Sequence, residues 1–372
     1  MSNYMLRFSL PPWLSYVLSV TGIASVVGAA ALYLYQCELI YPSSFPDGSR
    51  TEVAKPSDFG MKYTEETLIT RDKIKLRAYV ITLEDTDEAK RAPTILYFHA
   101  NAGNMGHRLP IAKIFNQKFK TNVVMLSYRG YGFSEGKANE KGLQVDSQTL
   151  LDFVKEHPIL KDTKFVAYGQ SIGGAVAIDL VSRNEASFSG LMVENTFLSI
   201  PKLIPSVFPV LRYFTVLCHQ QWPSEVNIQR IVKSPALFLS GAKDELVPPS
   251  HMARLYELCG TRENKDWVEF ANGTHNDTCM QTGYFSAIRE FLETRILKNE
   301  KLGHEDEELG SLESTVIANV EENDALQDPV TTSVHTSNRM VYQEEGYQLV
   351  NGKDDDISMA QSFSIEEVEL EE

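Results

Sequence analysis

Cysteine is sparse in this chain of 372 residues and forms no metal-binding or redox pattern. The four cysteines are Cys37, Cys218, Cys259 and Cys279, and no two of them have the C-x-x-C spacing typical of a zinc or redox site. We therefore expect single buried thiols and no metal site built from these cysteines. Pairing of two of these thiols in an oxidising compartment is the alternative interpretation.

A net excess of basic residues is also absent. The net charge is −15, but this negative charge comes from one segment of the chain. Twenty of the 50 acidic residues, but only three of the 35 basic ones, lie in residues 300–372. The rest of the chain is close to neutral, and nothing in it indicates an extended basic face for nucleic acid. The acidic segment has few apolar residues to bury, so we predict that residues 300–372 form a disordered tail.

Charged residues are missing altogether from residues 13–35, which are rich in Val, Ala, Ile and Leu. A helix of this length would cross a hydrocarbon core of about 30 Å. We predict an uncleaved signal anchor after a short flank, residues 1–12. A cleaved signal peptide with a small-residue site at residues 29–31 is the alternative.

The charges beside this stretch predict its orientation. Arg7 and the amino terminus precede it, whereas Glu38 and Asp47 follow it. The positive-inside rule then places the amino terminus in the cytosol, giving a single-pass type II membrane protein. We expect the endoplasmic reticulum or a later secretory membrane, with the plasma membrane as the alternative location.

Beyond a linker at residues 36–60, continuous apolar runs alternate with helical segments. Runs of this kind are typical of strands buried on both faces of a mostly parallel sheet with helical crossovers. The sequence predicts one α/β domain over residues 61–299. Its strands are expected at residues 74–83, 94–99, 122–127, 165–168, 190–193, 236–239 and 267–270.

Between two of these strands, residues 196–231 break the alternation. The segment is apolar and aromatic, contains four prolines and is much longer than an ordinary connection of about 4 to 6 residues. We predict an inserted cap that covers the strand ends and forms one wall of a pocket. A pair of surface helices without a binding role is the alternative.

One serine stands where a strand, a tight turn and a helix meet. Ser171 is flanked by Gly169 and Gly173, after a short apolar run and before a segment rich in Ala, Val and Ile. This G-x-S-x-G pattern is typical of a nucleophile elbow, in which the two glycines relieve crowding around a strained residue. A glycine-rich turn that happens to contain a serine is the alternative.

A nucleophilic serine requires a base, an acid that orients the base, and donors for an oxyanion. Asp244 directly follows a late strand, and His275 lies in the loop after the last strand. The order Ser171, Asp244, His275 is the one that this fold uses. Asp179, Glu194 and Glu245 are the competing acids.

The oxyanion donors are expected from two backbone amides. One is the N–H of Ile172, directly after the serine, and the other is the N–H of Asn101 or its neighbour, in a small-residue loop after an early strand. His99 opens that loop, and we expect it to shape the loop rather than to transfer protons. The remaining histidines are expected to be solvated or structural.

Together, five motifs resemble the alpha/beta hydrolase domain-containing protein 13 family, the Bem-type membrane serine hydrolases. They lie at residues 97–104, 128–136, 169–177, 193–201 and 273–278. The resemblance implies an α/β-hydrolase fold with a mostly parallel eight-stranded sheet, a small apolar cap and one transmembrane helix. It also implies Ser171, Asp244 and His275 as the triad. The family pattern usually has glycine where Ala100 stands.

The function predicted from these residues is that of a membrane-anchored serine hydrolase without a cofactor. We expect acyl esters or thioesters as substrates, either lipids or S-acylated proteins such as palmitoylated ones. The alternative is a non-catalytic binding or scaffold protein on a hydrolase fold. The sequons at Asn272 and Asn276 flank His275 and are expected to be unmodified, and the oligomeric state is left open.

Overall fold

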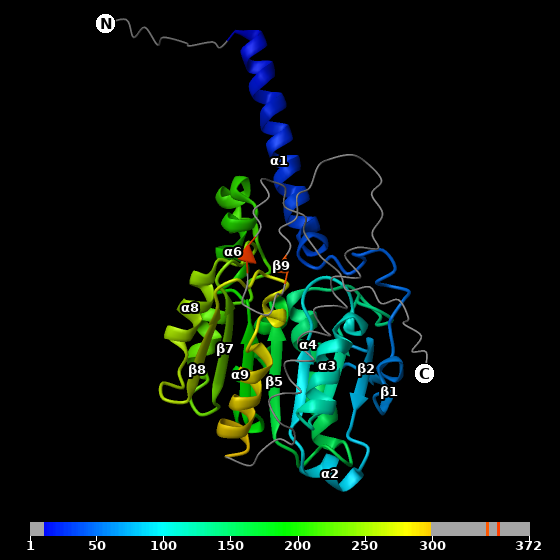
Figure 1. Ribbon diagram of the computed structural model, residues 1–372. Helices are drawn as coiled ribbons and strands as arrows, with labels where there is room; N and C mark the ends of the chain where they lie inside the picture. Colours follow the sequence, from blue (N-terminus) through cyan, green and yellow to red (C-terminus); the bar gives the residue numbers. More distant parts are fainter. Residues whose placement is uncertain (1–10, 299–339, 342–347, 350–372) are drawn as a thin grey trace, which may run out of the picture.

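The computed structural model describes residues 11–298, 340–341 and 348–349 (Figure 1). Most of the predicted tail therefore lies outside the described residues, as do residues 1–10. Two short strands are described within the tail, β9 (Met340–Val341) and β10 (Gln348–Leu349), which pair antiparallel.

The body is built on one sheet of eight strands, in the order β1-β2-β4-β3-β5-β6-β7-β8. Strands β3 to β8 run parallel to one another, and β2 pairs antiparallel with both β1 and β4. The predicted fold class, a mostly parallel α/β-hydrolase sheet, is confirmed. The strands are β1 (Tyr63–Ile69), β2 (Lys75–Ile81), β3 (Thr94–Phe98), β4 (Asn122–Ser127), β5 (Phe165–Gln170), β6 (Gly190–Glu194), β7 (Ala236–Gly241) and β8 (Lys265–Phe270).

Helices cover both faces of this sheet. The helices of the body are α2 (Thr86–Arg91), α3 (Leu109–Lys113), α4 (Glu140–Glu156), α5 (Ile172–Asn184), α6 (Ile200–Val207), α7 (Ser224–Asn227), α8 (Pro249–Leu258) and α9 (Tyr284–Phe291), of which α6 lies beyond the strand ends (Figure 1). Successive strand residues point to opposite faces. In β3, Leu96 packs with residues of α4, α5 and α8, whereas Ile95 packs with residues of α3 and α9. Both faces of the central strands are therefore core, which explains their continuous apolar runs.

Strand β1 was not among the strands predicted from the sequence. It lies at the edge of the sheet and reads YTEETLI, with only Leu68 buried. An edge strand of this kind carries no apolar run, and its alternation is too weak to distinguish it from a polar loop. Its position follows from pairing with β2, which is a tertiary contact.

The amino-terminal apolar segment forms one long helix, α1 (Pro12–Ile40). Residues Tyr16–Ile40 are long and apolar enough to cross a membrane. The first residues of the predicted linker thus belong to this helix. In Figure 1, α1 (blue) stands out from the body above one end of the sheet.

The chain after α1 packs on the body. Trp222 Nε1 donates to the Tyr41 hydroxyl at 2.8 Å, and that hydroxyl donates to Gln220 Oε1 at 3.0 Å. Further along, Asn104 Nδ2 donates to the carbonyl oxygens of Ser49 and Glu52. These contacts fix the base of α1 beside the segment between β6 and β7, and fix residues 49–52 beside the loop after β3.

Candidate active site

The turn around Ser171 is strained. Ser171 lies between the end of β5 and the start of α5 with φ 54° and ψ −122°, a backbone conformation that residues other than glycine rarely adopt. A Cβ at Gly169 would overlap the backbone of Gly173, and one at Gly173 would overlap the carbonyl of Phe98. The two glycines are therefore required by close packing, as the G-x-S-x-G pattern predicted.

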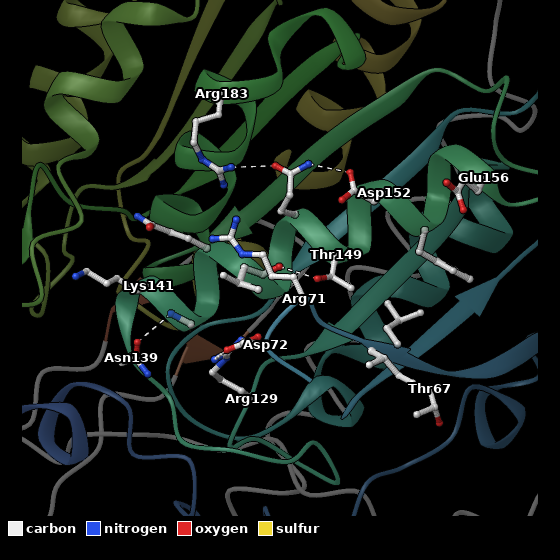
Figure 2. Close-up of a pocket in the computed structure, with 17 residues that line it drawn as sticks. Thr67, Arg71, Asp72, Arg129, Asn139, Lys141, Thr149, Asp152, Glu156 and Arg183 are labelled. Carbon is white, nitrogen blue, oxygen red and sulfur yellow. Dashed lines mark hydrogen bonds and ion pairs between the residues drawn. The ribbon is translucent and has the colours of Figure 1, made fainter. Parts of the chain in front are cut away.

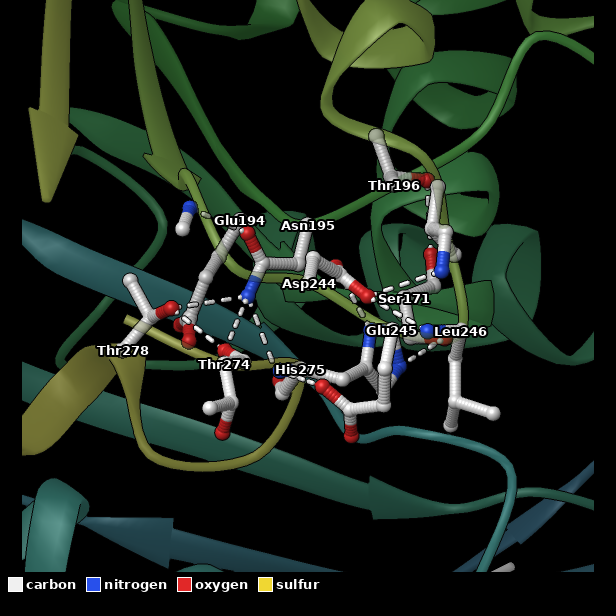
Figure 3. Close-up of polar contacts among 12 residues, drawn as sticks. Ser171, Glu194, Asn195, Thr196, Asp244, Glu245, Leu246, Thr274, His275 and Thr278 are labelled. Atoms are coloured by element: carbon white, nitrogen blue, oxygen red, sulfur yellow. Dashed lines mark hydrogen bonds and ion pairs between the residues drawn. The ribbon is translucent and has the colours of Figure 1, made fainter. Parts of the chain in front are cut away.

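Three side chains from separate loops meet at this turn (Figure 3). His275 Nε2 lies 3.1 Å from Ser171 Oγ, and His275 Nδ1 lies 2.8 Å from Asp244 Oδ2. With Nδ1–H donating to the carboxylate, Nε2 has its lone pair free to accept the serine proton. All three side chains are buried, and they follow β5, β7 and β8 at the carboxyl edge of the sheet.

Asp244 is itself held in place by the turn that follows it. Its Oδ1 accepts the backbone N–H of Leu246 at 2.9 Å and that of Val247 at 2.8 Å. Oδ2 is left for the imidazole. Both oxygens of the carboxylate thus have partners, and its orientation relative to His275 is fixed.

The competing acids have other partners. Glu245 Oε2 accepts the backbone N–H of His275 at 3.2 Å and is not paired with the ring. Asp179 forms an ion pair with Arg183 one turn along α5. Glu194 accepts hydrogen bonds from the Tyr168 and Tyr284 hydroxyls, both at 2.6 Å. Asp244 is the acid that contacts the imidazole.

The two predicted oxyanion donors lie on adjoining segments. Ile172 begins α5, where backbone N–H groups have no partner within the helix. Asn101 lies in the loop after β3, and the close approach of Gly173 to the carbonyls of Phe98 and His99 shows that this loop touches the first turn of α5. Within residues 11–298, neither amide donates to a protein acceptor.

His99 shapes this loop from a buried position. Its Nδ1 donates to the carbonyl of Ala100 at 2.7 Å, and its ring packs against Tyr128 and Tyr131. The Tyr131 hydroxyl in turn donates to the carbonyl of Asn101 at 2.8 Å. Burial lowers the pKa of His99 to about 3, so the ring stays neutral. The contacts and the pKa agree with a structural role.

Sequence reasoning missed the residue that holds the His275 loop. Asn195, directly after β6, donates through Nδ2 to Thr278 Oγ1 at 2.9 Å and to the carbonyls of Thr274 and His275 at 3.1 and 3.2 Å. Its Oδ1 accepts the N–H of Gly241 at 2.8 Å. Asn195 adopts φ 45°, a backbone conformation that the sequence does not reveal.

A buried polar network lies behind this loop. Gln170 Nε2 donates to the carbonyl of His275 at 3.1 Å and is 3.3 Å from Glu194 Oε1. Burial raises the pKa of Glu194, while the hydroxyls of Tyr168 and Tyr284 stabilise its charge. The network connects β5, β6 and α9 to the loop that carries His275.

A pocket of about 1230 Å³ lies elsewhere, between β1 and α4 (Figure 2). Arg129 in its wall binds Asp146 at 2.8 Å and Asp72 at 2.7 Å, and its hydrogen bonds hold the pKa of Asp72 well below its usual range. These ion pairs connect the turn after β4 to the turn between β1 and β2 and to α4. None of the residues that line this pocket belongs to the Ser171 site.

The sheet order, the strained serine turn after β5 and the histidine loop after β8 define the chain as an α/β hydrolase. A family model described as serine aminopeptidase, S33, matches residues 89–231. Among solved structures, an esterase from Pyrococcus furiosus, Pf2001, superposes with a TM-score of 0.54 at 18% identity, covering 66% of this chain and 95% of that one. At this identity the likeness shows the fold.

Closer relatives give the family. Protein bem46 of Schizosaccharomyces pombe is 49% identical over 284 residues, which are 74% of this chain and 93% of that protein. An uncharacterised membrane protein of Saccharomyces cerevisiae, YNL320W, is 44% identical over 269 residues, covering 72% and 92%. The chain belongs to the Bem46-like family of α/β hydrolases, which confirms the resemblance to the alpha/beta hydrolase domain-containing protein 13 family.

Proposed function

We propose that this protein is a membrane-anchored serine hydrolase that cleaves acyl esters or thioesters, with lipids or S-acylated proteins as substrates. The observation that carries the proposal is the continuous contact from Asp244 through His275 to the strained Ser171. A buried serine with a positive φ, hydrogen-bonded to an oriented imidazole, matches the requirements of nucleophilic catalysis.

The proposed reaction has two halves. Ser171 Oγ attacks the acyl carbonyl while His275 Nε2 takes its proton, and the oxyanion accepts hydrogen bonds from the amides of Ile172 and Asn101. His275 then gives the proton to the leaving oxygen or sulfur, which leaves an acyl-serine. Water, deprotonated by His275, hydrolyses that ester and restores Ser171, while Asp244 stabilises the imidazolium in each half.

Membrane anchoring is the second part of the proposal. Helix α1 has the length and composition of a membrane span, and the yeast relative is named as a membrane protein. We propose a single-pass type II topology in the endoplasmic reticulum or a later secretory membrane, with the body, residues 61–299, on the lumenal side. A glycosylation tag appended to the carboxyl terminus tests this, because it is modified only if that end is lumenal.

Labelling with a fluorophosphonate probe tests the chemistry. The wild-type full chain in membranes should be labelled, and Ser171→Ala should abolish the label. Ser199→Ala is the matched control, because Ser199 is equally buried and lies at the start of α6. A wild-type protein that folds and resists labelling would favour the scaffold alternative.

A further inference from the structure

The segment between β6 and β7 exposes apolar side chains at its tip. We call residues 203–218 the cap tip; they comprise most of α6 and the short turns η5 (Pro209–Tyr213) and η6 (Thr215–Leu217). Val216 and Val210 are 87% and 79% exposed, and Tyr213 and Phe214 are also exposed. The tip contains no acidic residue, and its one charged side chain is Arg212. Apolar surface concentrated in this way is typical of an interaction site.

The cap tip is fixed against the base of α1. Gln36 Nε2 donates to the carbonyl of Leu217 at 3.2 Å, and the N–H of His219 donates to Gln36 Oε1 at 2.8 Å. The rings of Tyr33 and His219 meet edge to face with centroids 5.0 Å apart. Figure 1 shows the end of the body that carries α6 rising beside the lower part of α1.

These contacts set the level of the tip relative to a bilayer. A span of about 20 residues crosses the hydrocarbon core, so a span that starts near Trp13 ends near Tyr33. His219, directly after the tip, contacts α1 at Tyr33, and Leu217 of the tip contacts it at Gln36, just beyond that point. The Arg212 guanidinium lies 4.6 Å from the centre of the Tyr213 ring, a pairing suited to the headgroup boundary, where aromatic rings and basic side chains anchor proteins.

The tip is also connected to the serine turn. Residues 195–202 join the end of β6 to the cap tip. Among them, the Thr196 hydroxyl donates to the carbonyl of Ser171 at 2.7 Å. Two residues on, the N–H of Leu198 donates to His251 Nδ1 at 3.3 Å. The segment that meets α1 is therefore continuous with the segment that borders the proposed nucleophile.

We propose that the cap tip docks into the headgroup boundary of the bilayer that α1 crosses, so that acyl chains reach Ser171 from the membrane and not from water. The inference rests on the proposed anchoring and extends it from one helix to a second, surface contact. Continuity with α1 and the single basic charge favour a lipid surface over a second protein copy, for which the tip offers no complementary acidic residue.

Fluorescence quenching by brominated phosphatidylcholine tests the contact directly. The full chain is placed in nanodiscs, and Val216→Trp is compared with Val232→Trp. Val232 is also an exposed valine, but it lies just before β7, at the amino ends of the parallel strands, whereas the cap tip follows the carboxyl end of β6. Relative to wild type, the quenched fraction of the fluorescence should rise in V216W and fall in V232W. Equal quenching of the two variants would overturn docking, whether the tip then faces water or a second copy.

A kinetic comparison adds a readout of substrate delivery. The ratio of hydrolysis rates for a bilayer-embedded long-chain ester and a soluble short ester, p-nitrophenyl butyrate, should fall about tenfold in Val216→Asp. It should stay at the wild-type value in Val232→Asp. An equal ratio in both variants would contradict delivery through the tip. If V216W is quenched but Ser171 resists fluorophosphonate, docking stands and the hydrolase proposal fails; release of the chain by carbonate extraction would refute the anchor itself.

Discussion

Two regions at the carboxyl edge of the sheet are held in opposite ways. The loop that carries His275 is buried and receives hydrogen bonds from Asn195 and Gln170. In the cap tip, by contrast, side-chain hydrogen bonds are few: the described ones come from Arg212, Thr215 and Cys218 and, at its carboxyl-terminal end, from Gln36 and Gln221 outside it. Chemistry that depends on a few tenths of an ångström is placed on a rigid polar frame, whereas contact with a non-directional apolar phase requires only exposed surface.

The largest effect should come from removing the base on the rigid side. His275→Ala should lower kcat for a soluble ester by about 10^4-fold or more, because both proton transfers in the proposed reaction pass through this ring. His251→Ala is the matched control, since His251 is also buried but accepts the N–H of Leu198. That variant should lose stability and retain most of its turnover. A similar loss of turnover in both would contradict the assignment.

Asn195→Ala should produce the next largest effect. It removes the donors to the His275 loop and leaves the N–H of Gly241 without an acceptor. We expect a loss of about 3 kcal/mol in the free energy of unfolding and a fall in kcat of about 100-fold with little change in KM. Asn184→Ala, which removes a half-buried amide at the end of α5, is the control and should leave kcat unchanged. A change in KM alone would refute the positioning role.

On the exposed side, single substitutions should have smaller effects. Tyr213→Ser removes one exposed ring from the cap tip, and we expect KM for a bilayer-embedded ester to rise about fivefold, which corresponds to about 1 kcal/mol of lost apolar contact. Ile69→Ser, on the exposed edge strand β1, should leave this KM unchanged. An equal rise in the two variants would show that the cap tip contacts the bilayer no more than β1 does.

The smallest expected effect is on the pH dependence of folding stability. Burial lowers the pKa of His107 to about 4, against 6.5 for the free side chain, so the unfolded chain binds a proton that the folded chain does not. Stability should therefore fall as the pH drops from 6.5 towards 4. His107→Asn should flatten that slope, measured as the urea midpoint against pH, because an asparagine side chain does not titrate. The amide oxygen can still accept the N–H of Asn104, so the fold should be kept. An unchanged slope would contradict the shift.

What could be predicted from the sequence follows from the range of the interactions. The buried strands and the elbow at Ser171 depend on local patterns, and the site residues Asp244 and His275 depend on strand ends that those patterns locate. Strand β1 depends on its pairing with β2, and its polar sequence carries no signal of its own. Helix α1 extends to Ile40, past the end of the apolar run, and Gln36 in this extension is hydrogen-bonded to Leu217 and His219.

The role of Asn195 could not be predicted for the same reason. Its partners Thr274 and Thr278 are about eighty residues away, in a loop brought near only by the pairing of β6, β7 and β8. Likewise, the position of the cap tip depends on its contact with α1, which lies more than 160 residues earlier in the chain. Motifs and strand ends in the sequence identify the candidate residues Ser171, Asp244 and His275. The residues that hold them in place can be identified only once the pairing of the strands is known.

The most direct test of the account maps the nucleophile. The full chain in nanodiscs is treated with a fluorophosphonate, digested and sequenced by tandem mass spectrometry. One adduct should be found on Ser171, and the rate at which it forms should fall about 10^3-fold or more in Asp244→Asn, where the carboxylate that orients His275 is lost. An adduct on another serine, or an equal rate in Asp244→Asn, would contradict the proposed triad.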